Sequence, residues 1–514
     1  MLGFLLVHGL VILLVAALCW RWLGDDLVID FGSWALFGEF LFFLACVGCV
    51  SGSGAIFVLD LGVIQTVVPT LTISCLFCFD EVSAAFMGIL ILALTICYYF
   101  LVDYFEYDVH GGSIFLLSFL FSQLAMLYFS AYDLFTILFL WEAISLVSFF
   151  LIHYWSHRLS SFKAGLKVLV VSHVGDVPLF LFFFVLWGRF QTTALVELTP
   201  LLAISSFEYL LVGPVLLNFN TYVACLLSGA VFLKSAQFFF YPWLLDAMEA
   251  PVPISAQLHS STLVIIGFYL YFRFISLFLA LPAVGLLFVF AGVTTALGAS
   301  FLGFFQEDGK RLLACSTAGQ LGYVVTALGL GAVEEALLLL VFSCVNKAFT
   351  FVWFGTLMQR YSGLSDFRFI GGAPLGSWGE HAGLAVALAN FTVFPGAFSW
   401  HVKGLFLRGH PTHYPSLTGC ALDVLQLTWL LSSLYMFRLY FAAFLRTSST
   451  PLASRPTPAG GAHVVAPLGS PYFAARTPAQ PNRLSVPFLV ASALVFASLA
   501  SLAGFVGIPT ADVS

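Results

Sequence analysis

The sequence predicts an all-α integral membrane protein of about fourteen transmembrane helices. Of its 514 residues, 61% are hydrophobic and only 9% are charged, and the mean hydropathy is +1.03. Soluble domains carry about 25% charged residues, so this composition cannot build an aqueous surface. The apolar residues also gather in runs of about twenty, the length that crosses a bilayer as a helix.

The expected helices follow these apolar runs in chain order. They lie near 3–22, 33–57, 82–104, 112–130, 133–154, 163–187, 217–240, 252–274, 281–304, 311–330, 333–357, 382–405, 420–445 and 485–508. The segment from Met1 to Cys19 contains no Lys or Arg. A cleaved signal peptide begins with a basic region, so we expect this run to be a permanent first helix.

The segment from Arg446 to Arg483 separates the last two runs and is rich in proline. It carries four Arg and no acidic residue, and it cannot span a bilayer. Basic residues also concentrate on the loops of one face if the helices alternate in direction: Arg158, Lys163, Lys310, Arg311, Arg360 and Arg368. The positive-inside rule places this face toward the cytoplasm or the mitochondrial matrix, with the N-terminus on the opposite side.

Composition also excludes some functions. The net charge is −6 and the 19 basic residues are scattered, so we expect no nucleic-acid partner. Two C-x-x-C spacings, Cys46 with Cys49 and Cys75 with Cys78, lie in or beside apolar runs without a His or acidic residue at ligand spacing. We expect these cysteines to be small packing residues rather than metal ligands or a disulfide.

Ionisable residues within the apolar runs are the strongest functional signal, because a charge inside a bilayer is costly. The sequence places one such residue in each of six expected helices: Glu142, Asp176, Lys234, His259, Lys347 and Lys403. Each could be a side chain that reaches the interface or half of a structural ion pair. Taken together, they predict a relay of acids and bases through the membrane.

Proline and glycine add a second signal near two of the lysines. Pro242, Pro251 and Pro253 follow Lys234, and Pro395-Gly396 precedes Lys403. Such residues interrupt helices, and the freed backbone groups must then line a polar cavity. Two interrupted helices, five helices apart, indicate the paired repeats found in transporters.

These residues carry a resemblance to the antiporter-like subunits of respiratory NADH:quinone oxidoreductase (complex I), and particularly to the chain 5 type. The motifs extend over about Phe79 to Arg446. They are Phe139 to Ile152, Val174 to Asp176, Lys234 to Gln237, Trp243 to Ala256 with His259, Asp308 to Arg311, Cys315 to Thr317, and Gln320 to Tyr323. A Lys at position 403 is similar to chain 5, whereas a Glu is expected there in chain 4.

The resemblance implies two inverted five-helix repeats, each containing a broken helix. We therefore expect N-terminal helices at 1–110, a first repeat at 111–275, a second at 276–445, a basic Pro-rich loop at 446–484 and a last helix at 485–514. It also implies roles. Glu142 and Lys234 form a coupled pair that Asp176 modulates, His259 and Lys347 carry protons along a central axis, and Lys403 is the exit base.

The implied function is proton translocation driven by quinone reduction in other subunits. This chain then holds no redox centre or cofactor, because FMN, the iron-sulfur clusters and ubiquinone belong to partner subunits. The implied location is the mitochondrial inner membrane, with the N-terminus toward the intermembrane space. The implied partners are other membrane-arm subunits, especially one of the chain 4 type, and lipids including cardiolipin.

The sequence departs from the family pattern at several places. Ser343 stands four residues before Lys347, where the family usually has His, and His173 stands where it has Arg. The family also continues into a lateral helix along the membrane arm, so we expect either that a separate polypeptide supplies one or that unrelated subunits make this contact. Three alternatives remain: a subunit of a multisubunit Na⁺/H⁺ antiporter, a structural subunit that does not pump, and a small-solute transporter.

Overall fold

A computed structural model describes most of the chain. The described residues are 38, 57–65, 72–370 except 106–107, 109–110, 206–207, 213–214 and 362, a few positions between 385 and 404, and 415–444. The expected helices near 3–22 and 485–508, nearly all of 33–57, the Pro395-Gly396 break and the Pro-rich loop lie outside these residues.

The first half of the described chain contains two hairpins and most of the helices that carry acidic residues. Its elements are β1 (Phe57–Gln65), β2 (Thr72–Phe79), α2 (Glu81–Tyr104), α3 (Gly111–Ser130), α4 (Leu134–Ile152), α5 (Leu159–Phe190), α6 (Leu195–Ile204), β3 (Tyr209–Val212), β4 (Val215–Asn218), α7 (Phe219–Lys234), α8 (Pro242–Asp246), η2 (Ala247–Glu249), α9 (Val252–Ser260) and α10 (Ile266–Arg273).

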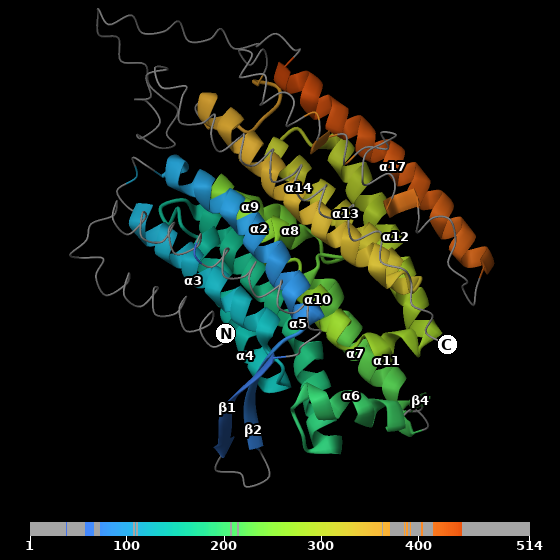
Figure 1. Cartoon of the computed structure of the whole chain (residues 1–514). Helices are drawn as coiled ribbons and strands as arrows, with labels where there is room; N and C mark the ends of the chain where they lie inside the picture. Colours follow the sequence, from blue (N-terminus) through green and yellow to red (C-terminus); the bar gives the residue numbers. More distant parts are fainter. Residues whose placement is uncertain are drawn as a thin grey trace, which may run out of the picture.

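The second half is entirely helical over the described residues. Its elements are α11 (Ile275–Leu279), α12 (Pro282–Phe305), α13 (Gly309–Gly329), α14 (Val333–Arg360) and α17 (Pro415–Phe444). Figure 1 shows α3, α4 and α5 on one side of the bundle and α12, α13 and α17 on the other. The short helix α9 packs against α2 and α14 between them.

Eight of the described helices are long and apolar enough to cross a membrane: α2, α3, α4, α5, α12, α13, α14 and α17. All eight coincide with expected spans, because a run of about twenty apolar residues is itself the determinant of a spanning helix. The chain is therefore a predominantly helical membrane protein.

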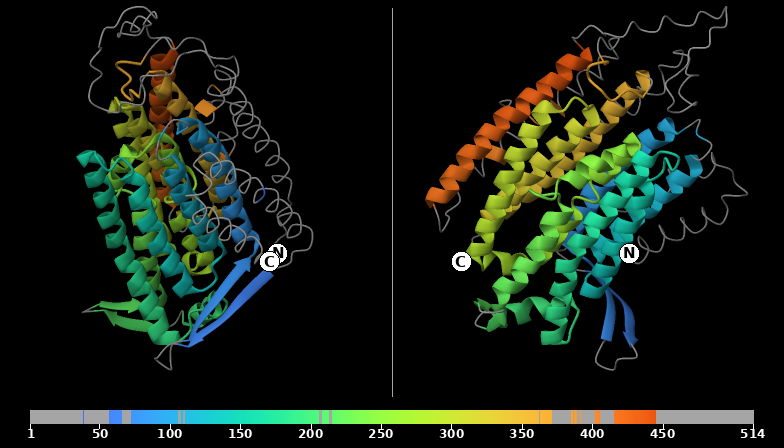
Figure 2. Two further views of the ribbon diagram at one scale, coloured as in Figure 1. Left: turned by 90° about the vertical axis from the view of Figure 1, so that its left-hand side faces the viewer. Right: turned by 180° about the vertical axis from the view of Figure 1, so that it is seen from behind.

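The structure differs from an all-α fold by two antiparallel hairpins. β1 pairs with β2 and β3 pairs with β4. Both hairpins project from the same end of the bundle, as both views in Figure 2 show. Their strands are short apolar runs, which periodicity alone does not distinguish from helix.

Buried polar side chains fix where several helices begin at this end. Asp80 caps α2 and accepts a hydrogen bond from the Ser83 backbone N–H, while Ser83 Oγ in turn receives the Asp80 N–H. Asp133 caps α4 through the N–H groups of Phe135 and Thr136. Such caps satisfy amides that the first helical turn leaves unpaired.

The expected span at 217–240 is an interrupted helix. α7 ends at Lys234, and the chain then passes through Ala236 and Phe239, whose φ angles are 54° and 74°. These positions lie in the left-handed region, which disfavours helix continuation. The break expected from the later prolines is confirmed, and it begins at the lysine itself.

The prediction of a single continuous helix at 252–274 is wrong in one respect. The chain forms α9, leaves regular helical structure over residues 261–265, and resumes as α10. The freed groups are satisfied locally, since Thr262 Oγ1 donates to the carbonyl of Gln257. This break contains neither proline nor glycine, so local composition did not indicate it.

Glycine allows α12 and α13 to approach closely. A Cβ on Gly322 would lie 2.8 Å from the carbonyl oxygen of Gly292, and one on Gly329 would lie 2.7 Å from that of Gly285. No real Cβ makes such contacts, so these positions require glycine unless the helices separate. Small residues commonly have this role in membrane helix packing.

Candidate functional site

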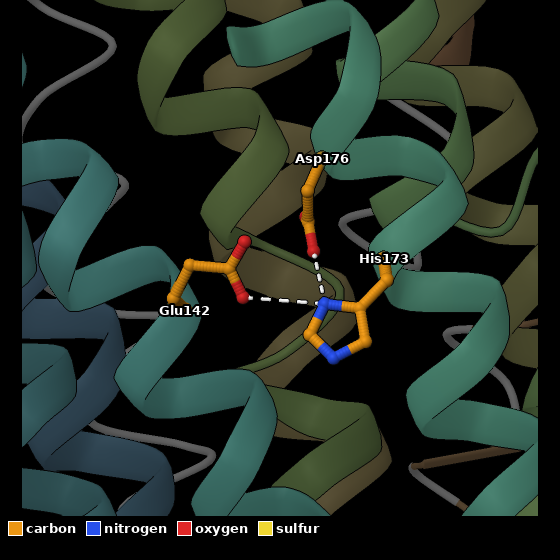
Figure 3. A group of neighbouring side chains, drawn as sticks. All are labelled: Glu142, His173 and Asp176. Atoms are coloured by element: carbon orange, nitrogen blue, oxygen red, sulfur yellow. Dashed lines mark hydrogen bonds and ion pairs between the residues drawn. The ribbon is translucent and has the colours of Figure 1, made fainter.

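The first group of ionisable side chains joins the middles of α4 and α5. Glu142 lies on α4, and His173 and Asp176 lie one turn apart on α5. The Nδ1 atom of His173 is 3.4 Å from Glu142 Oε2 and 3.2 Å from Asp176 Oδ2 (Figure 3). The Asp176 side chain is buried, whereas that of Glu142 is half-buried and that of His173 is 54% exposed.

Trp141 connects this group to the interior of the bundle. Its indole Nε1 donates to Asp176 Oδ1 at 2.5 Å, and its ring centroid lies 4.7 Å from Lys234 Nζ. The indole therefore contacts an acidic side chain at its edge and a lysine at its face. Both contacts are favourable, because the N–H is a donor and the ring face attracts cations.

Lys234 is buried at the C-terminal residue of α7. Its ammonium donates to Ser145 Oγ at 2.5 Å, and Ser145 Oγ in turn donates to the carbonyl of Trp141. No ion pair within 4.0 Å joins it to Glu142 in the described structure, although the charges of Asp176 and Glu142 both act on it. The two side chains are therefore near each other without direct contact, and their functional coupling stays a prediction.

His259 lies on α9 near the centre of the bundle and is almost completely buried. Neither ring nitrogen has a hydrogen-bond partner among the described residues. Its ring centroid is 6.3 Å from that of Phe351 on α14. Buried polar side chains surround it along the chain: Ser255, Gln257, Ser260, Ser261 and Thr262.

Lys347 and Lys403 form the group in the second half. Lys347, on α14, donates to Ser316 Oγ and lies over the ring of Phe391. Lys403 Nζ lies 4.7 Å from the ring centroid of Tyr323 on α13. The two ammonium groups are close enough to interact electrostatically, and both side chains are buried.

The sequence did not identify the neutral side chains that hold these charges. The sequence alone does not distinguish them from other residues of apolar helices, because their role depends on how a second helix packs against them. They are Trp141, Ser145, Ser316 and Tyr323. Their position inside the quoted motifs was the available signal. Lys310 was counted as a basic loop residue and as part of the motif Asp308 to Arg311, without a role of its own. Its ammonium donates to the carbonyls of Met248 and Ala250 and so supports the turn before α9.

Two features concern metal chemistry. The donor atoms of Glu142, His173 and Asp176 lie within 4.8 Å of one another, a spacing that a cation could bridge, although the sequence indicated no metal site. Cys78 is a buried free thiol. The other three cysteines of the two C-x-x-C spacings have no described side chain.

Known proteins resemble this chain in sequence and in fold. Residues 131–373 match the family described as NADH:quinone oxidoreductase/Mrp antiporter, TM. Over these residues the chain is similar to that family. The matched segment includes Glu142, Asp176, Lys234, His259 and Lys347, and Lys403 lies beyond it.

Curated relatives are named as subunits of NADH-ubiquinone and NAD(P)H-quinone oxidoreductases. The chain is 30% identical to NADH-ubiquinone oxidoreductase chain 5 of Triticum aestivum, over 72% of this chain and 55% of that protein. It is 33% identical to the chloroplastic NAD(P)H-quinone oxidoreductase subunit 5 of Anthoceros angustus, over 59% and 42%. The chain thus spans about half the length of the curated relatives it matches.

Two solved structures share the fold of this chain. A subunit of the Mrp complex from Dietzia sp. superposes with a TM-score of 0.73 at 22% identity, covering 96% of this chain and 49% of that one. A subunit of the archaeal membrane-bound sulfane sulfur reductase gives 0.77 at 15% identity, covering 98% and 95%. At these identities the likeness concerns the fold alone.

Proposed function

We propose that this chain is a proton-translocating membrane-arm subunit of a respiratory NADH:ubiquinone oxidoreductase in the mitochondrial inner membrane. It would contribute no redox centre, because the flavin, iron-sulfur clusters and ubiquinone would belong to partner subunits. The observation that carries the proposal is Lys234, a buried lysine at a helix break that contacts Ser145 and Trp141. Burying a charge inside the membrane is costly, so an ionisable residue in that position is a candidate for a functional role.

The proposed mechanism is electrostatic. Quinone reduction elsewhere changes the field at one end of the arm, which moves Glu142 and Asp176 relative to Lys234. A one-unit change in a pKa corresponds to about 1.4 kcal/mol, so a shift of a few ångström in a low dielectric suffices to release or capture a proton. Trp141 is well placed to transmit such a shift, because it contacts both Asp176 and Lys234.

The proton path continues through His259, Lys347 and Lys403 in this proposal. Buried polar atoms nearly always have hydrogen-bond partners, so water is the expected partner of His259. The serines and threonines around it offer further bonds. Lys403 is the proposed exit base, and a water held by Ser343 replaces the family's usual histidine as a relay.

The finer architecture is also proposed. We propose fourteen transmembrane helices, with two inverted repeats at 111–275 and 276–445. N-terminal helices at 1–110 precede the repeats, and the basic Pro-rich loop at 446–484 and a last helix at 485–514 follow them. The grouping of α3, α4 and α5 on one side of the bundle and of α12, α13 and α17 on the other supports this proposal (Figure 1). The interruption of α7 at Lys234 and the proline before Lys403 support one broken helix in each.

The proposed partners are other membrane-arm subunits, especially one of the chain 4 type, and lipids including cardiolipin. A subunit of a multisubunit Na⁺/H⁺ antiporter is the second candidate, and the Mrp antiporter in the description of the matching family favours it. Copurification with flavin and iron-sulfur subunits would support the first candidate and reject the second.

Substitution of Lys234 tests the function directly. We expect Lys234→Ala to reduce proton flux per NADH oxidised to the passive leak, measured in proteoliposomes at matched complex content. Lys234→Arg should fail as well, because guanidinium keeps its proton at physiological pH. Lys163→Ala, at an exposed position on α5, is the matched control. Full pumping by Lys234→Arg would reject the proposal in favour of a structural cation.

A further inference from the structure

His173 is a titratable side chain that the proposed proton path does not yet use. We infer that its Nδ1 atom carries a proton between the carboxyl groups of Glu142 and Asp176. This inference rests on the proposed function and adds a proton-carrying residue to it. The geometry of a single nitrogen shared by two carboxyl groups supports it.

The shared atom lies between its two partners. Nδ1 is 3.4 Å from Glu142 Oε2 and 3.2 Å from Asp176 Oδ2, so it can exchange a proton with either after a small approach. Figure 3 shows both carboxyl groups directed at this nitrogen, whereas the other ring nitrogen points away from them. No rotation of the imidazole is needed to change partner.

The position of His173 on α5 is unusual for a structural residue. Its side chain is 54% exposed, and the exposed neighbours Val170, Val174 and Val177 are apolar. A polar ring on such a face is costly in lipid. A side chain that stays charged would bridge Glu142 and Asp176 more favourably in a purely structural role, because a neutral imidazole offers only one hydrogen-bond donor.

The transfer needs two balanced steps. The O–H bond of protonated Glu142 breaks and an Nδ1–H bond forms, which leaves a carboxylate and an imidazolium. The Nδ1–H bond then breaks and an O–H bond forms on Asp176 Oδ2, which restores neutral imidazole. The second nitrogen keeps its own proton throughout, so the ring returns to its starting tautomer and no other reactant is consumed.

Protonation of Asp176 would also affect Lys234, because Trp141 contacts both side chains. Neutralising Asp176 removes a negative charge from the carboxyl group that Trp141 Nε1 contacts, and the same indole lies over the Lys234 ammonium. His173 contacts Glu142 of α4 and Asp176 of α5, and Lys234 of α7 also acts electrostatically on Glu142. Farther along α5, Lys167 is paired with Asp246 of α8.

Two substitutions separate a proton carrier from an electrostatic bridge. His173→Arg keeps a cation between the carboxyl groups but cannot release its proton. His173→Gln keeps polarity without charge or titration. Because general acid-base transfer contributes about 100-fold or more, we expect both variants to lose pumping by that order in the intact complex in proteoliposomes. NADH oxidation in the presence of an uncoupler should continue.

The outcomes distinguish this inference from the function on which it rests. Normal pumping by His173→Arg would show that the residue is only a cationic bridge. Normal pumping by His173→Gln would show that the two carboxyl groups, which are near enough to interact, exchange the proton directly. Either result overturns the inference while loss of pumping in Lys234→Ala preserves the function. Normal pumping by Lys234→Ala would reject the function itself.

Chemical rescue provides a readout that a structural role would not change. In His173→Gly, added imidazole can occupy the space of the side chain, which is partly exposed. We expect imidazole to restore proton flux and N-methylpyrrole, which has no titratable nitrogen, to have no effect. If the variants fail to assemble, histidine bands in infrared difference spectra of the isotopically labelled wild-type complex should change upon NADH addition. Unchanged bands would overturn the inference.

Discussion

At the scale of single residues, the buried lysines of this protein contact neutral side chains. Their partners, together with the indole that contacts Asp176, are Trp141, Ser145, Ser316 and Tyr323. A neutral partner donates or accepts a hydrogen bond without fixing the protonation state of the charged group, as a permanent ion pair would. Arg273 is also buried, but it pairs with an acidic side chain: it makes two hydrogen bonds to Asp80 at the end of the bundle that bears the hairpins.

Trp141→Phe tests whether the indole N–H matters apart from the ring. The change keeps an aromatic face over Lys234 and removes the donor to Asp176. We expect it to destabilise the assembled complex by about 1.5–3 kcal/mol, the usual value for a bond to a charged group, and to lower proton flux. Thermal unfolding and flux per NADH are the measurements. Trp187→Phe, on α5, is the control, and equal effects of the two changes would contradict the proposed link.

The Asp80 to Arg273 pair should contribute stability that depends on pH. Burial opposes ionisation, but the Arg273 guanidinium and Ser83 hold the pKa of Asp80 below its ordinary value. A lowered carboxyl pKa stabilises the fold above the ordinary pKa of about 4, and this contribution is lost as pH falls through the folded-state value. We expect Asp80→Asn to cost about 3 kcal/mol at pH 5–8, and less below about pH 4.

Thermal unfolding between pH 3 and 8 would measure this difference. Asp366→Asn is the control, because Asp366 also has a lowered pKa through its hydrogen bonds to Arg368, but Arg368 is exposed. Exposed pairs contribute about 0–1 kcal/mol. A cost for Asp80→Asn that did not change with pH would indicate a packing role for the residue.

At the scale of secondary-structure elements, the sequence predicted long helices well and interruptions only in part. The spans at α2 to α5 and α12 to α14 follow from apolar length alone. The break after Lys234 followed from later prolines, whereas that between α9 and α10 lies within Ser261 to Ile265 and depends on tertiary contacts. The contact of Trp141 with Asp176 depends on how α4 and α5 are rotated against each other, which no single-chain pattern specifies.

Gly322→Ala tests the contact between α12 and α13. A Cβ there would lie 2.7 Å from Thr295 Oγ1 and 2.8 Å from two backbone atoms, so the helices must separate. We expect a cost of about 1–3 kcal/mol, measured by thermal unfolding. Gly319→Ala, one turn earlier, meets only the Ala299 Cβ at 3.9 Å and should be neutral or slightly stabilising. Equal stability of the two variants would contradict close helix contact.

At the scale of the whole molecule, two of the basic loop residues that the sequence assigned to one face lie together at one end of the bundle. Arg311 is near Glu249 and Asp308, and Arg368 pairs with Glu307 and Asp366. The hairpins occupy the other end (Figure 1). The side of the membrane that each end faces stays a prediction.

Cysteine labelling tests that orientation. Ser156→Cys lies on an exposed loop at the basic end, and Tyr209→Cys lies on β3 at the hairpin end. We expect a membrane-impermeant thiol reagent added to intact mitoplasts to label Tyr209→Cys and to spare Ser156→Cys, because basic loops face the matrix. Protease should likewise spare the Pro-rich loop. The reverse pattern would invert the proposed topology.

The position of Lys234 as the last residue of α7 has a further consequence. The unpaired carbonyls at a helix C-terminus act as roughly half a negative charge, and this effect falls off within the last turn. The helix dipole of α7 therefore favours the ammonium whatever the state of Glu142 or Asp176. Lys234 has one attraction built into the backbone and another from mobile carboxylates, and only the second can be modulated during turnover.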